Sequence, residues 1–193
     1  MIEALLLAAA EPAMTAIDAE RAFAAEAQKL GQWTAFRKWS TPDAVMFTPK
    51  PGKAHDFLKD LKDPPVAVFW WPGRSYVSCD GKTAINTGPW VRQWGKSVGY
   101  FTTIWQKQAD GSWKWLLDHG DALQNPRAEG GDIKAQQASC SGKPTMMPHS
   151  GHSADWTLAW HYDVGSQGQR SVFAWIWTGT KYENVIDDSV KPQ

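Results

Sequence analysis

The stretch of sequence that decides the fold is GYFTTIWQKQADGSWKWLLDHG, residues 99–120. Aromatic and β-branched residues, which favour strands, fill both of its halves, and Asp110-Gly111 between them favours a tight turn. The stretch therefore predicts two antiparallel strands, over residues 98–108 and 113–119, joined as a hairpin. Similar runs precede it at residues 66–71, 75–79 and 83–94. Together these segments predict one antiparallel sheet.

Helical spacing marks the residues before this sheet. Thr15 and Asp18 have the form of a capping box, and apolar residues then recur every three or four positions up to Gly31. The spacing predicts a first helix here and a second over residues 33–39. A short strand over 44–48 and a third helix from Ala54 to Leu61 follow. The residues predicted to be buried between the layers are Phe23, Leu30, Phe36, Phe57, Leu61, Ile104 and Leu117.

Helices followed by an antiparallel sheet predict an α+β fold, with N-terminal helices packed on a strongly bent antiparallel sheet. A sheet bent in this way forms a cone whose open end is a pocket. Residues 15–123 are predicted to form this cone domain. Residues 124–154 collect Pro, Gly, Ser and Gln and are predicted to be a linker. Residues 155–193 are predicted to form a C-terminal β-hairpin extension.

The C-terminal extension contains segments similar to the predicted cone strands. SVFAWIW at 171–177 is similar to GYFTTIW at 99–105, and YENVIDD at 182–188 is similar to WKWLLDH at 113–119. The pattern indicates a degenerate repeat of the last strands, which would add edge strands to the sheet or cover it. Chance similarity between aromatic strands explains the pattern equally well.

The composition excludes several classes of function. The 193 residues carry 20 Lys plus Arg and 20 Asp plus Glu, so no net charge favours nucleic acid or a strongly charged substrate. No glycine-rich phosphate loop, serine nucleophile elbow or paired-cysteine motif occurs, and no cofactor is predicted. The 13 Trp residues are unusual, because Trp is favoured in cores, ligand walls and interfaces.

The N-terminus and the two cysteines bear on the compartment. Leu5–Ala10 and the small residues near Ala13 resemble the end of a secretory signal, although Glu3 stands where a basic region is expected. Residues 1–14 are therefore predicted to be a signal-like segment, and the protein is predicted to be periplasmic or secreted. The alternative is that these residues form an apolar extension of the first helix. The apolar run is too short to span a membrane. Cys79 and Cys140 form a bridge in an oxidising compartment, or else are two unrelated buried thiols.

Three segments carry a resemblance to a known family: TPDAVMFTP at 41–49, SCDGKTAINTGPW at 78–90, and the opening stretch at 99–120. Over residues 15–123 the chain resembles SnoaL-like proteins of the nuclear transport factor 2-like (cystatin-like cone) superfamily, in its uncharacterised domain-of-unknown-function branch. The resemblance implies a cone fold, which serves isomerisation, dehydration, hydrolysis, ligand binding and dimerisation. Thr48 and Thr103 stand where the ketosteroid isomerase branch has acids, so the resemblance implies no proton abstraction of that type.

Three ionisable residues are candidates for catalysis: His55, Asp118 and His119. An imidazole near a carboxylate could act as a general base. Strand alternation places Asp118 and His119 on opposite faces of the sheet, so only one of them faces the pocket. The alternative is structural, with Asp118 capping a turn and His119 at the surface.

The candidate ligand-binding residues are aromatic. They would supply an apolar pocket wall with a few hydrogen-bond donors, and they are Trp70, Trp71, Trp90, Tyr100 and Trp105. The linker holds soft metal-ligand types at Cys140, Met146, Met147, His149 and His152, but their spacing matches no tight zinc motif and no metal is predicted.

Three classes of function remain open. The first, which we favour, is a module that binds a neutral or weakly polar small molecule in an aromatic-lined cone. The second is a hydrolase or lyase that uses a pocket histidine. The third is an interaction protein that forms a homodimer through its sheet. A histidine and an acid converging in the cone would indicate an enzyme, and an exposed aromatic sheet face would indicate an interaction protein.

Overall fold

A computed structural model of the chain describes residues 14–125, 127, 131–145, 150–166 and 168–190. The predicted signal-like segment therefore lies almost wholly outside the described residues. Helix α1 (Ala16–Leu30) begins at the expected capping box, in which Thr15 and Asp18 exchange hydrogen bonds. Gly31, at φ 109°, ends α1 and starts α2 (Gln32–Trp39). Helix α3 (Ala54–Leu58) is shorter than predicted.

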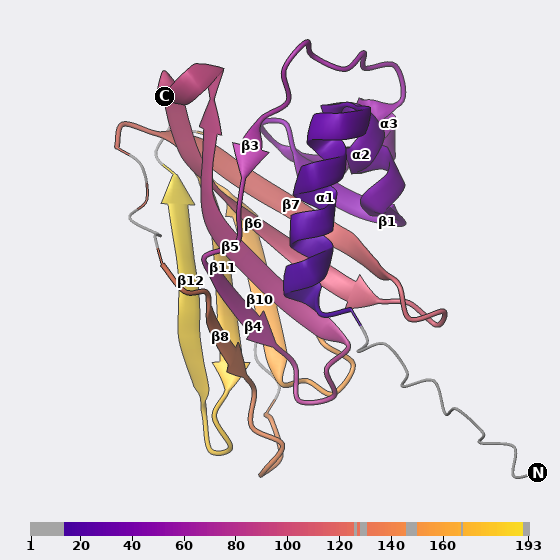
Figure 1. Cartoon of the computed structure of the whole chain (residues 1–193). Coiled ribbons are helices and arrows are strands. Elements are labelled where there is room, and N and C mark those ends of the chain that lie inside the picture. Colours follow the sequence, from indigo (N-terminus) through magenta and orange to yellow (C-terminus); the bar gives the residue numbers. More distant parts are fainter. Residues whose placement is uncertain (1–13, 126, 128–130, 146–149, 167, 191–193) are drawn as a thin grey trace, which may run out of the picture.

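The larger sheet holds eight strands in the order β2-β1-β7-β6-β5-β4-β8, with β3 paired to β5. It is strongly bent, and all three helices lie over its concave face (Figure 1). The strands are β1 (Ser40–Phe47), β2 (Pro51–Lys53), β3 (Phe69–Trp70), β4 (Arg74–Val77), β5 (Thr83–Arg92), β6 (Ser97–Lys107), β7 (Trp113–Leu123) and β8 (Lys134–Gln137).

Three of the predicted hairpins of the larger sheet are confirmed, since β4–β5, β5–β6 and β6–β7 pair antiparallel. A hairpin between residues 66–71 and 75–79 was also predicted and is wrong, because β3 pairs with β5 instead. The sheet as a whole is mixed rather than antiparallel. β1 pairs parallel to β7, and β8, from the predicted linker, pairs parallel to β4. Parallel neighbours need long connections, and in both cases a long stretch of chain separates the paired strands.

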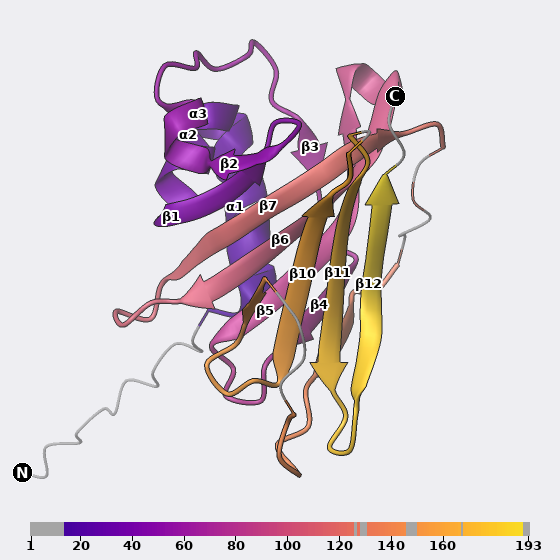
Figure 2. The ribbon, with the colours of Figure 1, turned by 180° about the vertical axis from the view of Figure 1, so that it is seen from behind.

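A second sheet packs on the convex face of the first and lies in front of it in Figure 2. Its strands are β9 (Gly151–His152), β10 (Leu158–Val164), β11 (Arg170–Trp177) and β12 (Tyr182–Val190), in the order β12-β11-β10-β9 and all antiparallel. The predicted C-terminal β extension is therefore present. It covers the convex face of the larger sheet and adds no strand to the edge of that sheet. The strand at that edge is β8, which comes from the predicted linker.

The larger sheet consequently has a hydrophobic core on each face. On the concave side α1 and α2 pack on an aromatic cluster that includes Phe101, Trp105 and Trp115. On the convex side Ile85, Ile104 and Leu117 pack against residues of β10, β11 and β12.

The predicted core was partly wrong. Phe23 and Phe36 are buried under the helices, but Ile104 and Leu117 are buried between the two sheets. Leu30 is 47% exposed and Phe57 40% exposed, and Leu61 is half-buried. Helical spacing identifies an apolar face but not whether another element covers it, and the ends of α1 and α3 are left uncovered.

The predicted disulfide is confirmed. Cys79, in the turn after β4, is bonded to Cys140, which follows β8, and their Cα atoms lie 5.2 Å apart. The same turn also contacts the second sheet, because the Cys79 N–H donates to the Thr157 hydroxyl and the Asp80 N–H to the Asp155 carboxylate. The disulfide therefore anchors the start of the C-terminal region to the larger sheet.

Ile104→Ala should lower the free energy of unfolding by about 2–4 kcal/mol, because it leaves a cavity between the two sheets. Leu30→Ala should lower it by less than about 1 kcal/mol, because that side chain is largely in water. Urea unfolding measures both changes. Equal losses in the two variants would contradict the placement of the second core.

Reduction of the disulfide should lower the free energy of unfolding by about 4 kcal/mol, because the bridge spans 61 residues and restricts the unfolded chain. Urea unfolding with and without reductant measures the difference. The double variant Cys79→Ser/Cys140→Ser is the matched control and should show the lower stability with no response to reductant. A reductant effect of the same size in that variant would refute the explanation.

Candidate functional site

A cavity of about 330 Å³ lies between α2 and the concave face of β5, β6 and β7. This is the open end of the cone that the sequence predicted. Most of its lining is aromatic or aliphatic, with a few polar groups among them. The lining residues are Gln32, Trp33, Phe36, Met46, Phe47, Val68, Trp70, Trp90, Arg92, Ser97, Tyr100, Phe101, Asp118, His119, Gly120, Asp121 and Ala122.

Three of the five predicted wall residues border this cavity: Trp70, Trp90 and Tyr100. The Trp90 indole lies across Gly99 on the neighbouring strand, where an added Cβ would come within 2.3 Å of the ring. Trp105 is fully buried beneath the wall, and Trp71 is half-buried beside Phe69 and outside the cavity lining.

Asp118 supplies a carboxyl group to the cavity. It lies on β7 opposite Thr103 of β6, whose hydroxyl donates a hydrogen bond of 3.2 Å to it. Burial, and next the charge of Glu20, raise the pKa of Asp118 to about 8. At neutral pH this side chain is therefore mainly a neutral acid, which both donates and accepts hydrogen bonds.

Sequence reasoning missed a second acid, Glu20 on α1, which is fully buried. Its carboxyl accepts N–H hydrogen bonds from Trp70 (2.9 Å), Trp105 (2.6 Å) and Asn86 (3.3 Å). Burial raises the pKa of Glu20 to about 7, while these three hydrogen bonds oppose the rise. Its place inside the apolar stripe of α1, four residues after Ala16 and three before Phe23, was the available signal.

The two acids differ in which state their surroundings favour. Glu20 receives only N–H donors, which suit a carboxylate, whereas Asp118 receives a single hydroxyl. Asp118 is therefore the more strongly protonated of the two carboxyl groups at neutral pH.

His119 faces the other side of the sheet. Its ring packs against those of Phe47 (4.8 Å) and Tyr100 (5.7 Å), and both ring nitrogens are buried without a hydrogen-bond partner. Burial, with the charges of Arg170 and Arg127, lowers the pKa of His119 to about 3. This imidazole is neutral at physiological pH, and it borders the cavity from the face of β7 opposite to Asp118.

His55 lies outside the cavity. Its Nε2 atom is 3.0 Å from the Ser40 hydroxyl and 3.2 Å from the Thr41 carbonyl oxygen, contacts that join α3 to β1. The structure thus places His55 apart from the other two catalytic candidates, whereas Asp118 and His119 both border the cavity, from opposite faces of β7. The prediction that the cone performs no isomerase-type proton abstraction stays a prediction.

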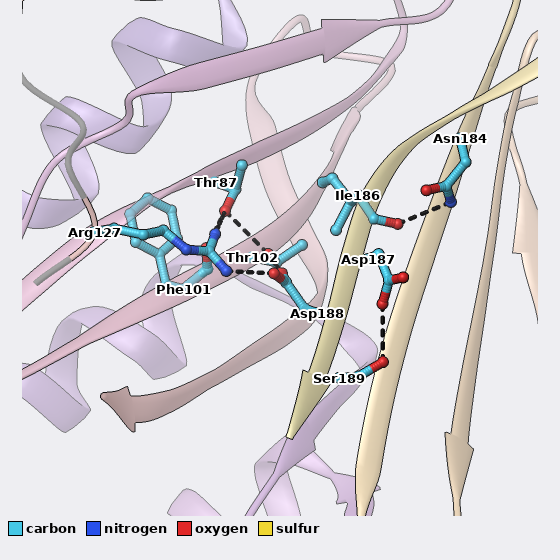
Figure 3. Close-up of polar contacts among 9 residues, drawn as sticks. All are labelled: Thr87, Phe101, Thr102, Arg127, Asn184, Ile186, Asp187, Asp188 and Ser189. Carbon is cyan, nitrogen blue, oxygen red and sulfur yellow. Dashed lines mark hydrogen bonds and ion pairs between the residues drawn. The ribbon is translucent and has the colours of Figure 1, made fainter. Parts of the chain in front are cut away.

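A separate polar cluster ties the two sheets together (Figure 3). The Asp188 carboxylate on β12 accepts a 2.6 Å hydrogen bond from Thr102 on β6 and forms an ion pair with Arg127. Arg127 also donates to the Thr87 hydroxyl at 2.9 Å and lies over the Tyr100 ring, 4.1 Å from its centroid. The charges in this cluster are matched, so it serves as a structural connection between the sheets.

The soft metal-ligand residues are not available as a set. Cys140 is bonded to Cys79, and Met146, Met147 and His149 lie outside the described residues. Among the residues that the structure covers, no three His, Cys, Asp or Glu side chains are placed to hold a metal ion. No helix in the described part is long and apolar enough to cross a membrane.

No protein-family model matches the chain, and no curated protein matches it. Similar solved structures include a provisionally assigned ketosteroid isomerase of Parabacteroides distasonis, with 16% identity, a TM-score of 0.46 and coverage of 57% of this chain and 89% of the other. A nuclear transport factor 2-like superfamily protein of Salmonella enterica has 13% identity, a TM-score of 0.39 and coverage of 60% and 94%. A cystatin-like fold protein of Burkholderia xenovorans has 16% identity, a TM-score of 0.39 and coverage of 55% and 84%.

The class that the architecture defines is an α+β cone, with N-terminal helices on the concave face of a bent sheet. This architecture agrees with the cone that the sequence predicted, here with a second sheet on the convex face. The narrower resemblance, to the domain-of-unknown-function branch, stays a prediction.

Asp118→Asn should make stability less dependent on pH. In the folded protein Asp118 and Glu20 hold protons that the unfolded chain releases near pH 4, so the free energy of unfolding falls as pH rises from about 4 to about 8. Removing Asp118 should flatten this fall by up to about 1.4 kcal/mol per pH unit. Urea unfolding at several pH values measures the slope.

Asp43→Asn, which alters an exposed carboxyl on β1, is the control and should follow the wild-type slope. A wild-type slope in Asp118→Asn would show that this carboxyl is ionised in the folded protein.

Proposed function

We infer that this protein binds a small molecule with a neutral or weakly polar body in the cavity of its cone. The observation that carries the proposal is an aromatic cavity of about 330 Å³ with a neutral carboxyl group, Asp118, on its inner wall. This volume suits a ligand of two or three fused rings or a short chain. The aromatic walls supply apolar contact, and the Asp118 acid supplies one directional hydrogen bond.

The geometry favours binding over a reaction that uses a histidine. His55 lies outside the cavity, and His119 faces the other side of the sheet with a pKa too low for a useful general base at neutral pH. His119 and Asp118 both border the cavity, but they lie on opposite faces of β7 and no hydrogen bond joins them among the described residues. A hydrolase or lyase would have to rely on Asp118, whose pKa of about 8 suits a general acid.

The dimer alternative loses its simplest surface, because the convex face of the larger sheet is already covered by β10, β11 and β12. The sheet surface left for a second copy is the outer face of β11, where the rings of Phe173 and Trp175 stack with centroids 6.0 Å apart.

The Cys79–Cys140 disulfide supports a periplasmic or secreted location, since such bonds persist in oxidising compartments.

Trp90→Ala should weaken the binding of 2-naphthol, an aromatic compound with one weakly polar group, by about tenfold. The substitution removes a ring that covers one side of the cavity, and a buried aromatic contact contributes about 1.4 kcal/mol or more. Titration followed by tryptophan fluorescence measures the dissociation constant.

His55→Ala is the matched control and should bind 2-naphthol as the wild type does, because His55 contacts only β1. Two results would contradict the proposal: no saturable signal in the wild type, or an unchanged dissociation constant in Trp90→Ala.

A further inference from the structure

The cavity of the cone continues into an open groove at its entrance. The groove has a volume of about 570 Å³ and shares Gln32, Trp33 and Arg92 with the cavity. Residues 64–66 line one part of it, and the turn between β5 and β6 lines another. The groove and the cavity are therefore neighbours that share part of their walls.

The turn between β5 and β6 holds a large aromatic ring in water. Trp94 is 95% exposed, and it lines the groove. Trp94 and Gln93 have φ angles of 60° and 50°, a left-handed conformation that residues other than glycine adopt uncommonly. Because the exposed Trp94 ring is apolar, a ligand that covers it would be stabilised by apolar contact.

The entrance is also positively charged. Arg92 and Lys96 are exposed and line the groove, and neither forms an ion pair with any described residue. The Arg92 guanidinium lies over the Trp90 ring, 5.6 Å from its centroid, so it stands at the boundary between groove and cavity.

Among the residues that the structure describes, no Asp or Glu lines the groove. Asp121, on the cavity side, is paired with Arg170. Asp63, next to the groove in sequence, is held at the start of α2, where it accepts hydrogen bonds from the Trp33 and Thr34 N–H groups.

We propose that the ligand of the cone is an amphipathic organic acid, with its apolar body in the cavity and its carboxylate in the outer groove between Arg92 and Lys96. This inference rests on the proposed function and adds the chemical class of the ligand. The neutral Asp118 carboxyl meets a hydroxyl or carbonyl group at the inner end of the ligand. Trp94 covers the outer part of its body, and the two cations bind its negative charge.

The test compares 6-hydroxy-2-naphthoate with its methyl ester, which has nearly the same shape and no charge. Calorimetric titration should show tighter binding of the acid by about fivefold to tenfold, since each exposed charge contact is worth up to about 1 kcal/mol. The double variant Arg92→Gln/Lys96→Gln should lose this preference and bind the acid and the ester with similar affinity. Raising the salt concentration should weaken binding of the acid alone.

Lys181→Gln is the charge-matched control. It alters an exposed lysine in the turn between β11 and β12, at the opposite end of the molecule from the β5–β6 turn, and should keep the full preference for the acid (Figure 1). Equal binding of acid and ester by the wild type would overturn this inference and leave binding in the cone standing. Absence of binding by both compounds would overturn the proposed function and this inference together.

Discussion

Glu20 accepts three N–H hydrogen bonds at the centre of the molecule, from Trp70 on β3, Asn86 on β5 and Trp105 on β6. A buried carboxyl group without such partners would cost several kcal/mol, so α1 has little freedom to shift over the sheet. One turn further along α1, Phe23 packs edge-on against Trp70, with ring centroids 4.9 Å apart. The space left beside this fixed contact, under α2, is the cavity.

The convex face of the larger sheet must be covered, whereas the concave face keeps a cavity. Ile85, Ile104 and Leu117 form an apolar surface that water must not reach, and a cone without a second layer would need a partner to cover it. Here the chain supplies its own cover, anchored by the Cys79–Cys140 disulfide and by the ion pair between Arg127 and Asp188. The cone can therefore be complete, with its cavity open to solvent, without a second copy of the chain.

Local patterns in the sequence predicted the hairpins, the capped first helix and the disulfide, because strand alternation, a capping box and paired cysteines act over short distances or leave few alternatives. The parallel pairing of β1 with β7 could not be predicted in the same way, since it depends on how distant segments meet. The candidate site was predicted only in part, because it also depends on how distant segments meet. The sequence singled out both Trp90 and Trp105 as wall residues, but only the position of α1 decides that Trp105 is covered by Glu20 while Trp90 borders the cavity.

The balanced net charge of the chain gave no indication of how charge is arranged along the path into the cone. Inside, burial and the neighbouring Glu20 favour the protonated form of Asp118, so this carboxyl group is mainly uncharged at neutral pH. At the groove, Arg92 and Lys96 are exposed to solvent, where a charged side chain has almost no desolvation penalty. A ligand that accepts a hydrogen bond from Asp118 further stabilises the protonated form, because an ionised carboxylate cannot donate. The path therefore favours a molecule that is weakly polar at its inner end and negatively charged at its outer end.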